Sequence, residues 1–318
     1  MSRRTALWIL VHAFVFWPTW RAGAASPAGE ALTAAAAGRG LIAVSRLDSA
    51  ISWTANPALL DANVVSVLSV QHTRWYGFSE LAAQSVSLCV PSVPIALTGT
   101  YFGGKLYRET ALTFSTAWGS TDLRAGVAVR VGQTAIARYG SHHGVALDLG
   151  VAYLFTPALM VSARGHNVLA WGSRVWAESL ARSLAVSLGA RLSTRAAVAA
   201  ELAKDPLYPA ESRVGLELKV LRALLLRAGV TVEPARTTLG LRFSLGRLLI
   251  DYAFVHHSVL GGTHFVGLTL LRSHPDRGRG GTPQHRVRGL HPLGAEDSDQ
   301  RLRLPGGVGA RATPLTIH

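Results

Sequence analysis

The stretch that decides the fold is residues 144–154, GVALDLGVAYL, in which large apolar residues alternate with small or charged ones. In an extended chain Val145, Leu147 and Leu149 face one side, and Ala146 and Asp148 face the other. A period of two indicates a β-strand with two unlike faces and does not fit a helix. One face of this strand is strongly apolar, and the other is small and partly polar.

The same alternation recurs through most of residues 64–271. The runs are about 8 to 11 residues long, close to the ~9 to 11 residues with which a tilted strand crosses a bilayer. Some joints are short, at 221–222 and 246, and others are long, at 72–80, 133–143, 166–180 and 254–263. Fourteen strands are predicted, at 64–71, 81–90, 92–102, 108–118, 122–132, 144–153, 158–165, 181–191, 195–203, 212–220, 223–231, 237–245, 247–255 and 262–271.

The second face of these strands separates a soluble sandwich from a membrane barrel. A sandwich would carry dense Lys, Glu, Thr and Asp on its outer face, whereas here that face is mostly Ala, Gly and Ser with an occasional Arg or Asp. Closing the sheet also removes unpaired edges, which lipid does not solvate. The predicted fold class is all-β: a transmembrane antiparallel up-and-down β-barrel of about 14 strands with an N-terminal luminal or plug segment.

Composition narrows the alternatives. The chain has 318 residues, of which 49% are hydrophobic and 16% charged, with a formal net charge of +14. The mean hydropathy is positive, so the basic charge does not indicate a nucleic-acid partner. One cysteine excludes an intramolecular disulfide framework and multi-cysteine metal sites. After residue 25 no charge-free apolar run reaches 18 residues, so helical membrane spans are not expected.

The two ends differ from the middle. Residues 1–24 join a basic start, an apolar core and a small-residue site at 22–24, which is typical of a secretory signal peptide. Residues 25–62 are a plug-like segment, 63–271 the barrel, and 272–318 a basic tail rich in Gly, Pro and Arg that is expected to be disordered. This organisation predicts the outer membrane of a Gram-negative bacterium, with both termini in the periplasm.

Residues 31–60 lack strand alternation. Trp53, Ile51 and Leu59 favour burial, which places the segment in the lumen rather than free in the periplasm. Pro57 keeps Asn56 out of helical geometry, which predicts a turn there. Trp53, Asn56 and Pro57 are therefore the candidate residues of the plug and its turn.

Several short motifs resemble one family. Residues 50–60, AISWTANPALL, resemble the A-x-x-W-N-P-A-G-L stretch that opens outer-membrane proteins of the PorV/PorQ type, within the FadL-like (long-chain fatty-acid transporter) barrels. The resemblance covers about residues 35–271 and implies a fourteen-stranded barrel with a luminal N-terminal segment. Further similar stretches are 71–75 (QHTRW), 146–153 (ALDLGVAY) with the turn at 162–167 (SARGHN), and the closing strands at 240–243, 251–253 and 260–264.

No catalytic constellation is evident. The pairs at 142–143 and 256–257 are histidines in predicted loops, but no carboxylate lies beside either pair to complete a metal site. The G-x-S-x-G elbow of a serine hydrolase does not occur. We therefore expect a non-enzymatic protein with no catalytic residues, no bound metal and no cofactor.

Inward-facing charges are the remaining candidates for a binding function. The strand phases turn seven basic and three acidic residues inward, a net of +4, which favours anionic or amphipathic solutes. An equally supported alternative is that the arginines pair with luminal carboxylates and plug carbonyls and serve packing alone. The ten residues are Arg124, Arg130, Asp148, Arg191, Arg213, Glu217, Lys219, Arg227, Arg242 and Asp251.

Two functions fit this barrel. The resemblance implies an accessory or docking component of type IX-like protein secretion, with outer-membrane lipid, secretion proteins or secreted cargo as partners. The alternative is a FadL-like passive uptake channel for hydrophobic or anionic small molecules, gated by the N-terminal segment. Partner capture distinguishes the first function, and solute uptake the second.

Overall fold

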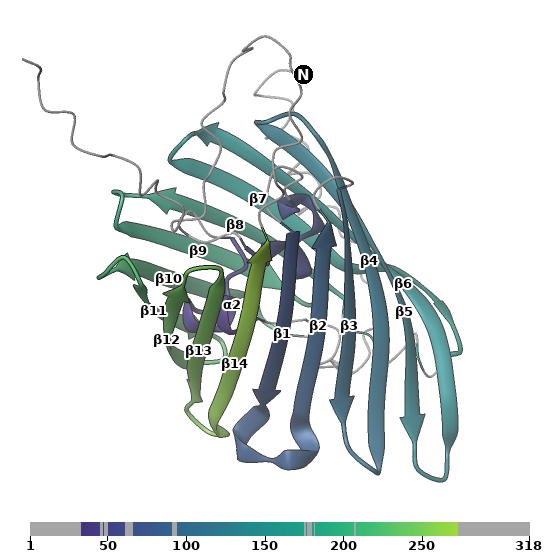
Figure 1. Cartoon of the computed structure of the whole chain (residues 1–318). Coiled ribbons are helices and arrows are strands. Elements are labelled where there is room, and N and C mark those ends of the chain that lie inside the picture. The colour runs from purple at the N-terminus through teal and green to yellow at the C-terminus, as the bar shows by residue number, and fades with distance from the viewer. Residues whose placement is uncertain are drawn as a thin grey trace, which may run out of the picture.

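The chain forms a closed barrel of fourteen antiparallel strands (Figure 1). The structure, a computed structural model, describes residues 33–44, 47, 50–60, 66–90, 94–174, 176, 180, 182–206 and 208–272. Each strand pairs with its neighbours in sequence, and β1 closes the ring against β14 from the pair Ser66–Arg272 to the pair Arg74–His264. The all-β barrel prediction is therefore confirmed, while the predicted signal peptide and the tail beyond residue 272 lie outside the described residues.

The strands lie close to their predicted positions. Fourteen were expected and fourteen pair in the ring. The strands are β1 (Ser66–Arg74), β2 (Ala82–Val90), β3 (Ile95–Gly103), β4 (Tyr107–Gly119), β5 (Leu123–Ile136), β6 (Gly140–Thr156), β7 (Leu159–Gly172), β8 (Ser183–Arg191), β9 (Ala196–Lys204), β10 (Glu211–Lys219), β11 (Leu224–Val232), β12 (Arg236–Leu245), β13 (Leu248–His257) and β14 (Gly261–Arg272).

The barrel has two unlike rims. At the near rim β1 begins and β14 ends, and the described turns between strands are at 120–122, 157–158, 192–195, 220–223 and 246–247, while β2 ends and β3 begins on either side of 91–94. The opposite end is called the far rim below. It is formed by the connections 75–81, 104–106, 137–139, 173–182, 205–210, 233–235 and 258–260.

The strands that extend furthest beyond their predicted ends at the far rim are β5, β6 and β7, each by at least four residues. The predicted loop at 133–143 is mostly strand, because β5 and β6 continue as a hairpin that turns at 137–139. The predicted loop at 166–180 is shortened in the same way by β7. Polar residues such as Gln133 and His143 break the apolar alternation without breaking the ladder, since main-chain hydrogen bonds do not require an apolar face.

The turn implied at 162–167 is instead an irregularity inside β7. Leu147 pairs with Leu169 and Leu149 with Gly165, so three residues of β7 lie opposite the single residue Asp148. Asn167 has a positive φ of 50°, which accommodates the extra residues. The strand therefore bends there and continues to Gly172 rather than reversing.

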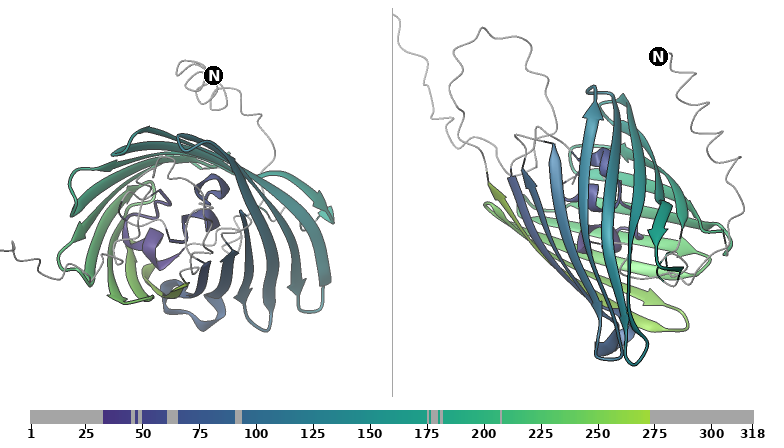
Figure 2. Two further views of the ribbon diagram at one scale, coloured as in Figure 1. Left: turned by 45° about the horizontal axis from the view of Figure 1, so that its top comes forward. Right: turned by 90° about the vertical axis from the view of Figure 1, so that its right-hand side faces the viewer.

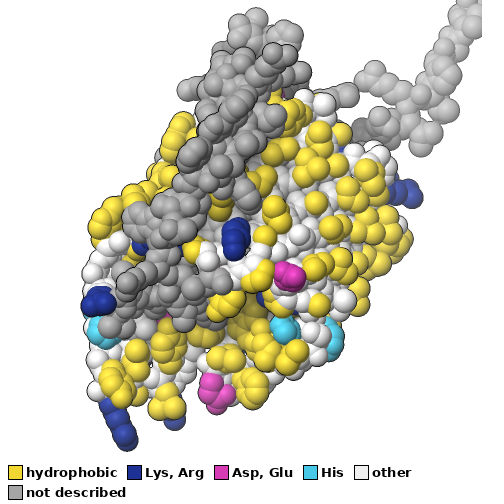
Figure 3. Space-filling view, turned by 180° about the vertical axis from the view of Figure 1, so that it is seen from behind, with side chains coloured by type: hydrophobic (Ala, Val, Ile, Leu, Met, Phe, Trp, Pro, Cys, Tyr) yellow, Lys and Arg dark blue, Asp and Glu magenta, His cyan; other side chains and the backbone are white. Residues whose placement is uncertain are grey.

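The outer surface of the barrel is largely apolar, as a surface in contact with lipid should be. Leu149 and Leu216, at the middle of β6 and β10, are 44% and 43% exposed, and hydrophobic side chains predominate on the face seen in Figure 3. A contiguous exposed apolar surface of this extent would be unfavourable in water. In the part of the chain that the structure describes, no helix is long and apolar enough to cross a membrane.

The described part of the N-terminal segment lies inside the ring of strands (Figure 2). It contains helix α2 (Ala34–Gly38) and two short 3-10 turns, η2 (Ser52–Thr54) and η3 (Pro57–Leu59). Helix α2 contacts β11 to β14, whereas η3 contacts β4 to β6. The loop after β1 holds two further 3-10 turns, η4 (Trp75–Gly77) and η5 (Ser79–Leu81).

Candidate functional site

The barrel interior is shaped by glycines that face each other across neighbouring strands. Gly215 of β10 pairs with Gly229 of β11, and the backbone of Arg39 and Gly40 lies directly against both. A Cβ added at Gly229 would overlap the Gly40 nitrogen. The missing side chains therefore let the N-terminal segment approach the wall as closely as backbone on backbone.

A second glycine pair receives the other end of the segment. Gly126 of β5 pairs with Gly150 of β6, and η3 lies against them. A Cβ at Gly126 would overlap the Ala58 nitrogen, and one at Gly150 would overlap the Asn56 Oδ1. The two pairs fix where α2 and η3 dock on opposite arcs of the barrel.

A third pair receives a loop from the far rim. Gly132 and Gly144 are direct partners on β5 and β6, and the ring of Trp176 covers both. Trp176 belongs to the connection between β7 and β8 and is buried against Ala146. The loop thus contributes a side chain to the interior as well as spanning the rim.

Arg39 pins the segment to the wall. Its guanidinium donates to the carbonyls of Ile42 at 3.0 Å and Ala43 at 2.9 Å, which folds the segment around it. The same group forms an ion pair with Glu217 at 3.1 Å, and both side chains are almost completely buried. A buried charge of this kind is tolerated only when it is paired and hydrogen-bonded.

The ion pair continues as a ladder across four strands. Arg227 bridges Glu217 at 3.3 Å and Asp251 at 2.8 Å. Arg242 binds Asp251 through two bonds of 2.9 Å and 2.8 Å. Glu217 with Arg227, and Arg242 with Asp251, are direct cross-strand partners, so the register itself brings opposite charges together.

A second group of charges lies on β9 and β10. Arg213 binds Glu201, its cross-strand partner, at 2.8 Å and Glu211 at 2.9 Å. It also donates to the carbonyl of Leu41 in the N-terminal segment at 3.1 Å. Ser187 donates to Glu201 at 2.6 Å, which adds a hydrogen bond to the buried carboxylate.

A third group fills the irregularity in β7. Arg130 donates to Asp148 at 2.8 Å and to the side-chain oxygen of Asn167 at 2.7 Å. Asp148 also accepts from the Asn167 backbone at 2.7 Å, and His166 Nδ1 lies 3.0 Å from it. The extra residues of β7 are thus held by polar contacts to a neighbouring carboxylate.

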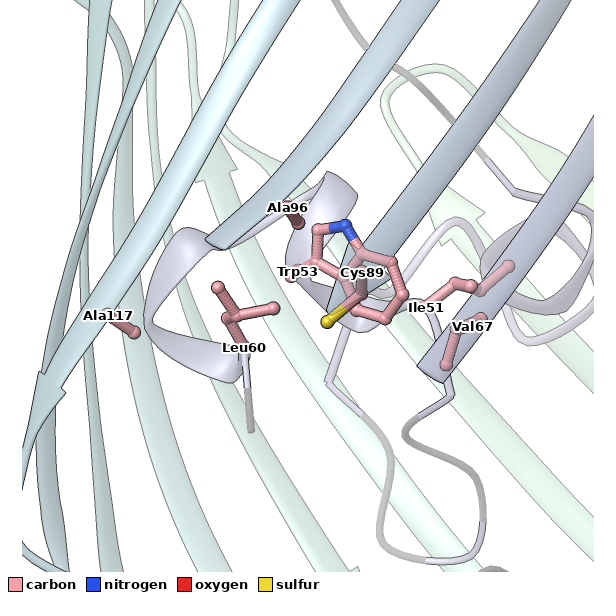
Figure 4. Packing of buried hydrophobic residues seen from close by; sticks show 7 residues of the cluster. All are labelled: Ile51, Trp53, Leu60, Val67, Cys89, Ala96 and Ala117. Carbon is pink, nitrogen blue, oxygen red and sulfur yellow. The ribbon is translucent and has the colours of Figure 1, made fainter. Parts of the chain in front are cut away.

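The candidate plug residues lie where the segment meets the near rim. Trp53 is buried in a cluster with Ile51, Leu60, Val67 and Cys89 from the segment and the first two strands (Figure 4). The indole ring of Trp53 lies beside Cys89 of β2. This cluster packs the N-terminal segment against the near-rim ends of the first strands.

Asn56 and Pro57 form the turn that precedes the last part of the segment. Asn56 is extended and caps η3 by accepting from the Ala58 nitrogen at 3.0 Å. Its amide donates to the Ala163 carbonyl of β7 at 3.3 Å. Pro57 occupies the first position of η3, where its lack of an N–H costs nothing.

The structure divides the ten predicted inward charges into two sets. Three lie at near-rim strand ends and are half-exposed, namely Arg124, Arg191 and Lys219. Arg191 there donates to the Pro157 carbonyl at 2.9 Å. The other seven are buried and ion-paired: Arg130, Asp148, Arg213, Glu217, Arg227, Arg242 and Asp251. This geometry favours the packing alternative for the buried set.

Sequence reasoning missed several members of these networks. Glu201 sits among alanines in β9, yet its position in the alternation places it on the inward face and was sufficient to find it. Arg39 lies in the non-strand segment, and its partner Glu217 is 178 residues away. Arg164 of β7 donates to the Ala55 carbonyl at 3.3 Å, but it lies within the stretch 162–167 that the resemblance identified as a turn.

The paired histidines do not assemble into a metal site. His143 and His256 face outward, while His142 and His257 take the alternate phase on their strands. Among the described residues no group of three or more His, Cys, Asp or Glu side chains is arranged to hold a metal ion.

Comparison with known proteins supports the fold. No protein-family model matches the chain, and no curated protein matches it. Among solved structures, the CymD monoaromatic hydrocarbon channel superposes with a TM-score of 0.53 at 14% identity, over 71% of this chain and 93% of that chain. The Pseudomonas putida toluene transporter TodX gives a TM-score of 0.51 at 12% identity, over 78% and 97%.

A FadL homologue from Pseudomonas aeruginosa is equally similar, with a TM-score of 0.51 at 11% identity over 78% of this chain and 97% of that chain. At these identities the likeness shows a shared β-barrel fold and no more. It does not show membership of the PorV/PorQ type.

Proposed function

We propose that this protein is a non-enzymatic outer-membrane channel for passive uptake of small hydrophobic molecules, with the N-terminal segment as its gate. The observation that carries the proposal is a lipid-compatible closed barrel whose interior is occupied by a docked segment of its own chain. The similar folds CymD and TodX are, by their descriptions, channels or transporters for aromatic hydrocarbons. That likeness supports the uptake alternative over a docking role in protein secretion, which draws no support from these folds.

The pairing of the interior charges favours an apolar solute over an anionic one. On the described strands nine inward basic residues oppose six inward acids, and the buried ones are engaged with one another or with carbonyls of the segment. A charge already neutralised by a partner offers little attraction to a solute anion. We therefore expect a solute to pass through the barrel only when the N-terminal segment moves out of its way.

Toluene uptake by cells tests the proposal, because a lipopolysaccharide-covered outer membrane resists toluene, whereas a plain phospholipid bilayer passes it freely. We expect cells that produce the protein to take up toluene faster than cells that lack it, and Arg39→Gln to increase the rate, because the segment loses its ion pair while Glu217 keeps Arg227. Arg191→Gln is the matched control, since Arg191 contacts a near-rim carbonyl and not the segment. Uptake no faster than by cells that lack the protein would reject the channel, and equal rates for the two variants would reject the gate.

A further inference from the structure

On the described strands, the outward face carries basic side chains and no acidic ones. Within the described strands every Asp and Glu occupies an inward position: Glu109, Asp148, Glu201, Glu211, Glu217 and Asp251. The outward positions hold only bases and histidines, namely His72, Arg74, Arg108, His143, Lys204, His256, His264 and Arg272. All of these except Arg272 lie within four residues of a strand end at the far rim. Apart from Arg272, the charged outward side chains of the described strands thus form a basic band at their far-rim ends, next to an apolar belt.

The basic groups are densest where the barrel closes. Arg74 of β1 and His264 of β14 are direct cross-strand partners, and His72 lies two residues before Arg74 on the same face. Tyr252 of β13 forms a 2.8 Å hydrogen bond between its hydroxyl and the Nδ1 of His264. The ring of Phe254 lies 5.2 Å from that of His264. These contacts orient the imidazole and direct its Nε2 away from the hydroxyl.

One acid lies near this surface: hydrogen bonds lower the pKa of the Glu80 carboxyl most, and the positive charge of Arg74 lowers it further. Glu80, the acid nearest to Arg74 along the chain, lies in η5 of the loop and accepts from the Ser79 hydroxyl at 2.9 Å. Below the basic groups the outward face becomes apolar at once, with Val70 and Val266 both more than 40% exposed. A partner for this surface therefore needs an anionic head and an apolar body.

We propose that the rim surface formed by His72, Arg74, Tyr252 and His264 binds the phosphates of a phosphorylated glycolipid in the leaflet at the far rim. Adjacent strands lie ~4.8 Å apart, so three strands spread these donors over about 10 Å, which is wider than one phosphate. A disaccharide carrying two phosphates matches that span, and its acyl chains continue onto the apolar belt. Arginine and imidazole donors suit phosphate oxygens, and the phenol suits a sugar hydroxyl. This inference rests on the proposed membrane location.

Native mass spectrometry of the detergent-solubilised protein tests the inference. The probe is bisphosphorylated lipid A, with dephosphorylated lipid A and phosphatidylcholine as comparison lipids. We expect the protein to retain the phosphorylated lipid, and Arg74→Gln with His264→Gln to weaken retention at least about fivefold, the scale of one basic group at a membrane surface. The single variants and Tyr252→Phe should each give a smaller loss.

Arg272→Gln is the matched control, because Arg272 ends β14 on the outward face at the near rim. Retention equal to wild type in the double variant would overturn the inference, as would an equal loss in Arg272→Gln or equal binding of dephosphorylated lipid. Unboiled gel mobility shows that each variant is folded. The double variant should take up toluene at the wild-type rate. If the wild type itself takes up no toluene, the channel is rejected, and lipid retention still tests this inference on its own.

Discussion

Individual glycines on the inner wall determine where the N-terminal segment docks. The pairs Gly215–Gly229 and Gly126–Gly150 are each formed by adjacent strands, and each lies beneath a different part of the segment. The small second face was visible in the sequence, but its purpose was not. A glycine opposite a glycine marks backbone approach only when the register of the two strands is known.

Gly229→Ala should therefore destabilise the protein. The added methyl group would meet the Gly40 backbone, and overpacking of this kind costs about 1–3 kcal/mol. Gly99→Ala is the matched control, because nothing lies within 4 Å of a Cβ at that position of β3. Urea unfolding of the refolded barrel, followed by tryptophan fluorescence, gives both free energies of unfolding. Equal values would show that the segment does not dock on this pair.

Asp251 is a buried carboxylate that joins two arginines of the ladder. It pairs with both Arg227 and Arg242, and its side chain is 1% exposed. Asp251→Asn should lower the free energy of unfolding by about 3–5 kcal/mol, because the buried Arg242 and Arg227 each lose a charged carboxylate partner. Asp122→Asn, in an exposed near-rim turn, should leave it within about 0.5 kcal/mol. A small effect at Asp251 in the same urea experiment would mean that water reaches the ladder.

The strands are the elements that the sequence predicts best. Period-two patterning identified all fourteen because lipid on one side and a small lumen on the other impose unlike faces on every strand. Strand ends were predicted less well at the far rim, where β5 to β7 leave the apolar belt and the alternation fades. At these ends the main-chain hydrogen bonds maintain the strands, and the side-chain pattern does not predict how far the strands extend.

The phase of β10 gives a direct test of the lipid-facing surface. Leu216→Arg, at the middle of the strand, should destabilise the protein by about 2–4 kcal/mol, because a charge at mid-depth in a bilayer is costly. Val232→Arg, at the far-rim end of β11, should cost only about 0–1 kcal/mol. Unfolding in lipid vesicles measures the difference. Equal costs at the two positions would reject the depth assignment.

At the scale of the whole molecule, the segment and the barrel are one packed unit. The sequence indicated burial of Trp53 and a turn at Asn56, but it did not reveal Arg39 as the pin, since the pairing of Arg39 with Glu217 exists only once the barrel is closed. Contacts between residues so far apart depend on topology. The local sequence pattern therefore predicts the strands of the barrel, whereas the contacts of the N-terminal segment become visible only in the tertiary structure.

The single cysteine reports on this packing. Cys89 is 2% exposed beneath Trp53, so a water-soluble maleimide should label it slowly in the folded protein. Trp53→Ala should raise the labelling rate at least about tenfold, because removing a buried indole lowers the local opening free energy. Trp118→Ala, on the outer face, is the control and should leave the rate unchanged. Fast labelling of the wild type would contradict the docked position of the segment.

The double docking of the segment also bears on how the chain assembles. Helix α2 rests on β11 to β14, the last strands made, and η3 rests on β4 to β6, which are made much earlier. A segment that precedes all fourteen strands therefore ties together two arcs of the wall that are far apart in the sequence. Any docking of the segment that precedes closure would hold these arcs near each other and so reduce the entropy cost of pairing β1 with β14.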